Sequence, residues 1–322
     1  MQNEAKEILE QMNRVIVGKE DVTKKILMAF LSGGHVLLED VPGVGKTTIA
    51  LAFSHILGLD YRRIQFTSDT MPSDITGFSV YDRDGNSLRY VPGAAMTNLL
   101  LADEINRTSS RTQAALLEVM EEGNITIDGT TREVPKPFMV IATQNPAGSA
   151  GTQLLPSAQL DRFMIRLSVG YPDFRSQVEM LRSRHHENPL RQIKTVTDCE
   201  RFMQMQEAVR NMTVSDVIYE YVVRLSEATR NHEQIRQGLS PRAMLALCSM
   251  AKAAAYIEGR EYVIPSDVSG IFLEVSVHRI LLNTRARMAE TEKEEILREI
   301  LEKEECPEMK EKIIETAGGK RQ

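Results

Sequence analysis

The sequence is poor in cysteine, has no long apolar run and carries no excess of positive charge. Its three cysteines, Cys199, Cys248 and Cys306, are dispersed and odd in number, which argues against a disulfide framework or a thiolate metal site. The N-terminus is polar and lacks the apolar region of a signal peptide. No uncharged apolar run is long enough to cross a bilayer. We therefore expect a soluble, cytoplasmic protein with reduced thiols and no membrane insertion.

The charge balance disfavours one class of partner. Lysine and arginine total 39 against 45 aspartates and glutamates, so the formal net charge is −6. A mildly acidic chain is a poor candidate for nucleic-acid binding unless a local basic patch forms. The 322 residues, 42% of them hydrophobic, are enough for two domains with substantial cores.

Short apolar runs alternate with helical patterns through the first half of the chain. The expected strands are 35–39, 99–103 and 138–142, with weaker candidates at 61–66 and 164–169. Continuous apolar strands separated by helices predict a parallel sheet that is covered on both faces. Two Asp-Gly turns predict β-hairpins over 78–91 and 125–134.

The pattern changes after residues 171–173, and the chain up to 282 is predicted to be helical, with no convincing strand. The last segment is rich in Glu, Lys and Arg and carries a narrow apolar stripe that includes Ile296 and Ile300. We therefore predict an α/β core over 1–171 with two hairpin inserts, an all-α domain over 172–282, and a charged helical tail over 283–322.

The segment from Asp40 to Thr48 follows a predicted strand and opens a predicted helix, which is the context of a Walker A phosphate loop. Backbone N–H groups of such a loop surround phosphates, and the helix N-terminus adds to this attraction. Lys46 would reach the β- and γ-phosphates, and the Thr47 hydroxyl would bind Mg²⁺. ATP and Mg²⁺ are thus the predicted cofactors. The candidate nucleotide-binding residues here are Pro42, Gly43, Val44, Gly45, Lys46, Thr47 and Thr48.

One position departs from the phosphate-loop consensus. Asp40 stands where the first glycine is expected, although Pro42 and Gly43 can still form the turn. The alternative is an ordinary strand-to-helix turn that happens to contain Gly-Lys-Thr.

Polar residues also end two other predicted strands. Asp103 and Glu104 follow an apolar run, and acids at the carboxyl end of a parallel strand point into the usual ligand crevice. Asp103 would hold Mg²⁺, and Glu104 would orient and polarise the attacking water. Asn145, after the strand predicted at 138–142, would contact the γ-phosphate or that water. The alternatives are a helix cap for the acids and an Asn-Pro turn for Asn145.

These motifs together resemble the AAA+ ATPases and, more narrowly, the MoxR family. The matching strings are LLEDVPGVGKT, NLLLADEINR, QAALLEVMEE, VIATQNPAG, LPSAQLDRF and GLSPRA. The resemblance implies a P-loop core with a five-stranded parallel sheet, a helical lid and a ring, usually a hexamer. It also implies that the hairpins are the helix-2 insert and the pre-sensor-1 hairpin of that clade. Val17 and Gly18 would form the backbone site near the adenine.

The resemblance implies functional roles for two arginines. Arg162 matches the arginine finger that acts on the nucleotide of a neighbouring subunit, with Arg166 and Arg107 as alternative candidates. The alternative for Arg162 is a local ion pair with Asp161 or another acid.

Arg242 matches the sensor-2 arginine, after Ser240 as a helix N-cap and Pro241 as the first helical residue. A cation in the first turn opposes the helix dipole, which is understandable if a phosphate lies opposite. An arginine lying along the lid surface is the alternative.

The leading functional hypothesis is a MoxR-like ATPase that remodels, assembles or matures partner proteins, including by metal or cofactor insertion. The resemblance suggests a client with a von Willebrand A domain. The alternatives are an AAA+ nucleic-acid motor or loader and a slowly hydrolysing nucleotide switch. Acids accompany the few arginines of both predicted hairpins, and Glu104 is present, so the first hypothesis is favoured over both.

Overall fold

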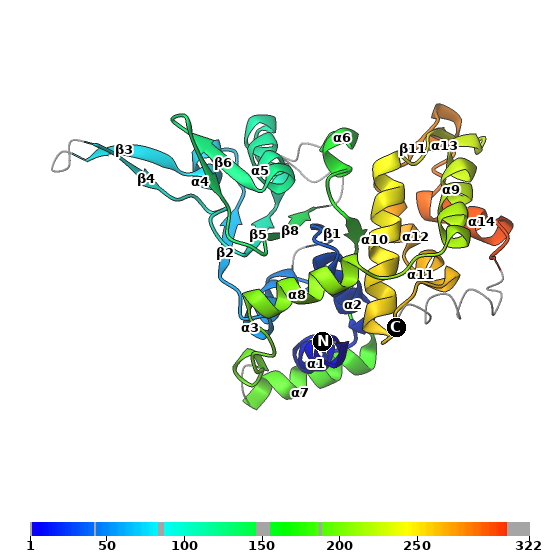
Figure 1. Cartoon of the computed structure of the whole chain (residues 1–322), viewed down its shortest axis with the longest axis horizontal. Helices are drawn as coiled ribbons and strands as arrows, with labels where there is room; N and C mark the ends of the chain where they lie inside the picture. Colours follow the sequence, from blue (N-terminus) through cyan, green and yellow to red (C-terminus); the bar gives the residue numbers. More distant parts are fainter. Residues whose placement is uncertain (1, 42, 83–86, 146–154, 187–188, 308–322) are drawn as a thin grey trace, which may run out of the picture.

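The computed structural model describes residues 2–41, 43–82, 87–145, 155–186 and 189–307. Its centre is a five-stranded parallel sheet in the order β2-β5-β8-β1-β9, which confirms the predicted core (Figure 1). The strands are β1 (Val36–Glu39), β2 (Tyr61–Gln65), β5 (Leu99–Asp103), β8 (Met139–Gln144) and β9 (Ile165–Leu167).

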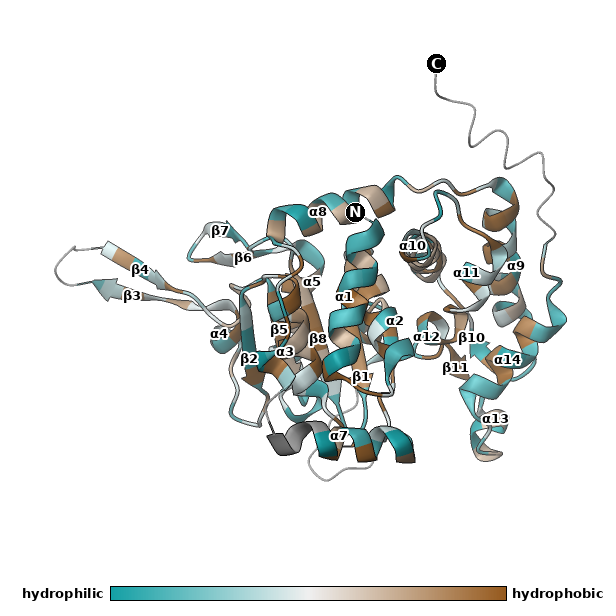
Figure 2. Ribbon diagram, turned by 90° about the horizontal axis from the view of Figure 1, so that it is seen from below, coloured by the Kyte–Doolittle hydropathy of each residue, from teal (hydrophilic) through white to brown (hydrophobic). Residues whose placement is uncertain are grey.

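Helices cover both faces of this sheet because successive strand residues point in opposite directions. Leu99 and Leu101 join the core beneath the first three helices, whereas Leu100 packs with Leu116 and Leu117 on the other face. The inner strands are correspondingly apolar (Figure 2). The helices of this half are α1 (Gln2–Val15), α2 (Glu20–Leu31), α3 (Lys46–Ile56), α4 (Pro72–Thr76), the 3₁₀ turn η1 (Ile105–Arg107), α5 (Ser110–Glu122) and α6 (Ser157–Leu160).

Both predicted hairpins are present. The first pairs β3 (Phe78–Asp82) with β4 (Ser87–Val91), and it projects far from the sheet (Figure 1). The second pairs β6 (Asn124–Ile127) with β7 (Thr130–Glu133). The Arg132 guanidinium lies 4.2 Å from the centre of the Tyr90 ring, so the two hairpins contact each other.

The second half of the chain is helical, as expected, and packs beside the sheet. Its helices are α7 (Phe174–His186), η2 (Pro189–Arg191), α8 (Cys199–Arg210), α9 (Asp216–Asn231), α10 (Pro241–Ile257), α11 (Pro265–Ser269), α12 (Phe272–Ser276), α13 (Thr284–Met288) and α14 (Lys293–Lys303). A short antiparallel ladder, β10 (Ile235–Gln237) with β11 (Leu281–Leu282), was not predicted because two or three residues are too few to show an alternating pattern.

The predicted domain boundaries remain a prediction, but the apolar stripe of the tail is buried. Ile296, Leu297 and Ile300 of α14 pack into the core that α9 and α12 share. Arg279, in the turn after α12, is buried and pairs with Asp161 from the sheet half at 2.6 Å. Among the described residues, none of the helices has the length and apolarity needed to span a membrane.

The strand register brings three loops together at one edge of the sheet. Glu39 at the end of β1 lies beside Gln144 of β8, and β8 lies beside β5. The segments that follow these strands contain the phosphate loop, Asn145 and the Asp103-Glu104 pair. Their proximity therefore follows from the strand order, since parallel strands end at the same edge.

Candidate functional site

A cavity of about 600 Å³ opens at this edge, a volume suited to a nucleotide. The sequence-predicted residues that line it are Val17, Gly43, Val44, Gly45, Lys46, Thr47, Thr48, Asp103, Glu104 and Asn145. Pro42 lies outside the described residues. The structure thus gathers ten predicted positions from four separate segments of the chain around one space.

The phosphate loop has the backbone that its glycines allow. Gly43 and Gly45 have φ angles of 90° and 97°, which side chains rarely tolerate. Gly45 is the N-cap of α3, so the N-terminus of that helix faces the cavity. Lys46, the first residue of α3, donates from Nζ to the carbonyl oxygen of Asp40 at 2.8 Å. Burial lowers the pKa of Lys46, while Asp40, Asp103 and Glu104 oppose that shift.

The two acids are held by one hydroxyl group. Thr143 donates from Oγ1 to Asp103 Oδ1 at 2.6 Å and accepts the Glu104 backbone N–H at 2.8 Å. Thr143 is fully buried in β8. Arg63 of β2 binds the other Asp103 oxygen at 2.5 Å. The sequence analysis missed Thr143 and Arg63, because only the pairing of β8 and β2 with β5 places them here.

Glu104 adopts a backbone conformation that is unusual for a residue with a side chain. Its φ of 59° and ψ of 47° are left-handed, and they begin the 3₁₀ turn η1. Its carboxylate accepts from Asn145 Nδ2 at 3.3 Å and from Arg107 Nη1 at 2.9 Å. Asn106 in turn binds the Asn145 backbone through its side chain. The acid predicted to polarise water is therefore oriented by the residue predicted to sense phosphate.

Two further segments, near the start and the middle of the chain, also line the cavity. Ile16 and Val17 come from the first segment, and Tyr171, Gln177 and Met180 come from the second. Gly18 does not line the cavity, but its backbone packs closely against α7, where a Cβ would lie 2.2 Å from the Ser176 hydroxyl. No sequence motif indicated that the residues after 170 would line this cavity.

Arg162 and Arg242 lie elsewhere and do not line this cavity. Both bind Glu121, the first at 2.9 Å and the second at 2.5 Å. Ser240 caps α10 through the Ala243 N–H, as the sequence predicts, but the charge beside Arg242 is a carboxylate of the same chain. The alternative candidates are also paired, Arg166 with Glu39 and Glu294, and Arg107 with Glu104.

The cavity offers the groups that phosphate and a hard cation require. Lys46, the α3 N-terminus and the loop amides supply positive charge for phosphates. The Thr47 hydroxyl and the Asp103 carboxylate are oxygen ligands of the kind that Mg²⁺ prefers, and both residues line this cavity. Glu104 adds a carboxylate for proton abstraction from water.

Comparison with known proteins agrees with this geometry. Residues 35–165 match the family described as "ATPase family associated with various cellular activities (AAA)", and residues 227–300 match the AAA lid domain. The chain is 44% identical to the uncharacterised protein YeaC of Bacillus subtilis over 93% of each chain. It is 38% identical to chaperone MoxR1 of Mycobacterium tuberculosis, over 93% of this chain and 81% of that one.

A solved structure supports the same assignment. A crystal structure from Cytophaga hutchinsonii, of a protein described as a candidate ATPase, superposes with a TM-score of 0.88 at 34% identity, covering 95% of this chain and 96% of that one. The agreement extends over core and lid together. The chain therefore belongs to the MoxR family of AAA+ ATPases.

Proposed function

We propose that this chain hydrolyses ATP with the help of Mg²⁺ and assembles into a hexameric ring. This ring remodels or matures partner proteins in the cytoplasm. The observation that supports hydrolysis is the convergence of Lys46, Asp103, Glu104 and Asn145 on one cavity. The similarity to a protein named a chaperone supports a protein as the client.

Each residue has a separate task in the proposed reaction. Lys46 and the loop amides hold the β- and γ-phosphates, and Thr47 and Asp103 hold Mg²⁺, whose charge offsets that of the phosphates. Glu104 accepts a proton from the attacking water, and Asn145 keeps that carboxylate oriented through the 3.3 Å hydrogen bond.

The test separates binding from turnover. We expect Lys46→Ala to lose ATP binding, and Glu104→Gln to bind ATP but not release phosphate. Glu122→Gln, on the exposed end of α5, is a matched control that should behave as the wild type. ATP affinity and phosphate release are measured for all three variants. Normal turnover by Glu104→Gln would refute the assigned mechanism.

Hydrolysis is proposed to need a neighbouring subunit, because Arg162 does not line the cavity of its own chain. An arginine acting across an interface contributes roughly 10³–10⁵ in rate in well-studied systems. Inactive Glu104→Gln and Arg162→Ala subunits are mixed, and some interfaces then pair an intact Glu104 with an intact Arg162. If the subunits co-assemble and no mixture recovers activity, Arg162 does not act in trans.

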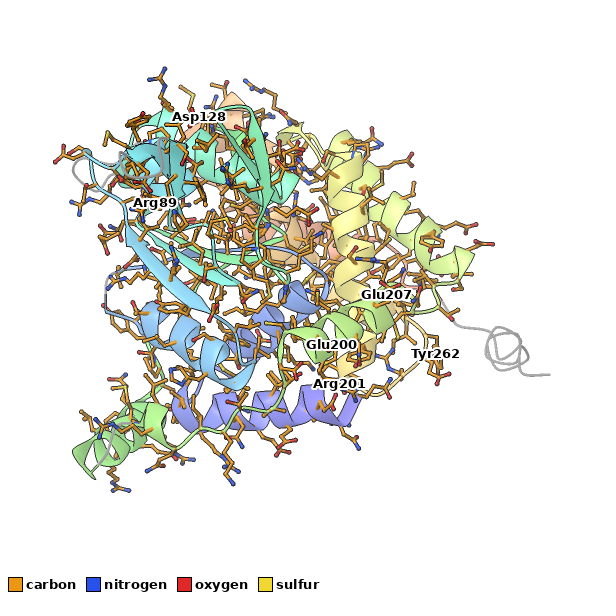
Figure 3. All side chains as sticks on the ribbon, turned by 60° about the vertical axis from the view of Figure 1, so that its left-hand side comes forward. Arg89, Asp128, Glu200, Arg201, Glu207 and Tyr262 are labelled. Carbon is orange, nitrogen blue, oxygen red and sulfur yellow. The ribbon has the colours of Figure 1, made fainter. Side chains whose placement is uncertain are left out.

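The proposed client is a protein with a von Willebrand A domain, and no nucleic acid is expected. The described parts of the two hairpins contain two arginines, Arg89 and Arg132, and three acids, Asp82, Asp128 and Glu133. Arg89 and Asp128 lie at the same end of the molecule (Figure 3), and Arg132 packs on Tyr90. A motor that tracks phosphates needs repeated cationic contacts.

This choice of client has its own test. The ATP-bound Glu104→Gln ring is titrated with single- and double-stranded nucleic acid at low salt, and a purified von Willebrand A-domain protein is titrated in parallel. We expect saturable binding of the protein only. Tight, salt-sensitive nucleic-acid binding that also stimulates the wild-type ATPase would favour the motor instead.

A further inference from the structure

Glu121, at the C-terminal end of α5, bridges two arginines from different parts of the chain. Its Oε2 lies 2.9 Å from Arg162 Nε, in the turn between α6 and β9. Its Oε1 lies 2.5 Å from Arg242 Nη2, in the first turn of α10. One carboxylate thus joins the sheet half to the lid, using one oxygen for each arginine.

The surroundings of this trio carry excess positive charge. Arg162, Arg242 and Glu121 line a cavity of about 260 Å³ that shares no residue with the nucleotide cavity. Asp161, the other acid in its wall, is engaged by Arg279 at 2.6 Å. Among the described residues, neither Arg162 nor Arg242 has a second carboxylate within 4.0 Å, so two cations share one anion.

The three side chains remain accessible to an incoming ligand. Their exposed fractions are 30% for Arg162, 45% for Arg242 and 34% for Glu121. The hydrogen bond from Arg242, with the nearby charge of Arg162, lowers the pKa of Glu121. Arginines arranged in this way suit a phosphate, which they bind through paired N–H groups.

The position of Glu121 on α5 indicates that a phosphate bound by the arginine pair would belong to a nucleotide on another molecule. The helix follows Glu104 and the turn η1, and Glu121 is near its other end. Thirteen residues of helix span roughly 20 Å, at about 1.5 Å per residue. A nucleotide bound beside Glu104 is therefore far from the arginine pair of the same chain.

We propose that Glu121 is a positioning residue that assembles Arg162 and Arg242 into one cationic site for the terminal phosphate of ATP bound to a neighbouring copy of this chain. This inference rests on the proposed function, because it assumes that Arg162 acts in trans. Without Glu121 the two guanidinium groups repel each other, and the lid arginine loses its tie to the core. The terminal phosphate would then be bound by two separated guanidinium groups and not by one cationic site.

The first test is the kinetics of Glu121→Gln, which keeps the shape of the side chain and removes its charge. We expect the ATP dissociation constant to stay within about twofold, since the cavities share no residue, and kcat of the assembled protein to fall by roughly 10- to 100-fold, as for a misplaced catalytic group. Glu122→Gln, one residue along on the same helix, should leave both values unchanged. An unchanged or higher kcat in Glu121→Gln would overturn the proposal.

The second test assigns the defect to one side of the interface. Mixtures of Glu121→Gln with Glu104→Gln should regain activity, whereas mixtures of Glu121→Gln with Arg162→Ala should not, because both damage the same side. The double variant Glu121→Gln/Arg162→Ala should lose less activity than the two single losses combined, because both changes damage the same cationic site. Additive losses, or recovery in the second mixture, would show that Glu121 does not act through Arg162.

The same mixtures test the roles of Arg162 and Glu121 separately. If Arg162→Ala fails to complement Glu104→Gln, Arg162 does not act on the nucleotide of a neighbouring subunit. If that pair complements but Glu121→Gln retains full kcat, the trans site stands and only the role of Glu121 is refuted.

Discussion

The carboxylate of Asp40 accepts the backbone N–H of Gly170 at 3.2 Å, across 130 residues of sequence. It also accepts the N–H of Val169 and the Ser168 hydroxyl, and it is largely buried. The residue that departs from the phosphate-loop consensus thus anchors the loop to the segment that leaves β9 for α7. Its own carbonyl oxygen meanwhile accepts from Lys46.

Asp40→Gly would restore the consensus glycine, yet we expect it to destabilise the protein. The N–H groups of Val169 and Gly170 would lose a charged acceptor, and a lost partner of this kind costs about 2–3 kcal/mol. Asp40→Asn, which keeps one acceptor oxygen, should lie between the glycine variant and the wild type. Denaturant unfolding measures all three. Equal stability of Asp40→Gly and the wild type would contradict the anchoring role.

Thr143→Val should damage turnover more than binding. Valine keeps the shape of threonine but removes the hydroxyl that orders Asp103 and Glu104, and a shift of about 1 Å in a catalytic group costs up to about 10²-fold in rate. We expect kcat to fall by roughly 10- to 100-fold, with ATP affinity changed by less than about threefold.

The control for this prediction is Thr143→Ser, which retains the hydroxyl and should retain most of kcat. If Ser and Val variants lose activity equally, the methyl group and its packing matter, and the hydroxyl does not orient the acids.

Arg63→Ala should make Mg²⁺ binding tighter. Arg63 occupies one oxygen of Asp103, the predicted metal ligand, and so competes with the cation. A partly exposed pair of this type contributes about 0.2–1 kcal/mol, so the half-saturating Mg²⁺ concentration should fall by up to about 5-fold. The measurement is ADP binding at a series of Mg²⁺ concentrations, since ADP has no γ-phosphate for Arg63 to contact. ADP affinity in chelator is the control, and a higher Mg²⁺ requirement would disprove the competition.

His35 should make the fold sensitive to acid. It precedes β1, accepts the Val140 N–H at Nδ1 and faces the Met120 carbonyl from Nε2, both at 3.1 Å. The neutral ring with its proton on Nε2 satisfies both bonds. Burial lowers the pKa of His35 from 6.5 to about 4, against the smaller opposing effect of the Met120 bond.

The direction of the pH effect follows from this shift. As pH falls, His35 is protonated near pH 6.5 in the unfolded chain but only near pH 4 in the folded protein. The free energy of unfolding therefore decreases progressively between about pH 6.5 and pH 4, by about 3 kcal/mol in total. Buried His278 shifts in the same direction. Unfolding free energy is therefore compared between the wild type and His35→Gln across this range. Parallel pH profiles would show that His35 is not the titrating group.

Local patterns were sufficient to predict much of this protein. The apolar strands, the glycines around Lys46 and the acids that end β5 each depend on residues that are close together in the sequence. Such features can therefore be predicted from the sequence alone. The five parallel strands and both hairpins were predicted from such patterns and confirmed. The edge position of Asp103 and Asn145 also follows locally, because every strand of a parallel sheet ends on the same side.

Only the tertiary structure decided which side chains meet. Thr143 reaches Asp103 across 40 residues, Asp40 reaches Gly170 across 130, and Arg242 reaches Glu121 across 121. These contacts depend on the order of strands in the sheet and on how the lid packs beside it. Hydrogen bonds and ion pairs act over about 3 Å and have no periodic signature along the chain, so packing of distant segments determines them.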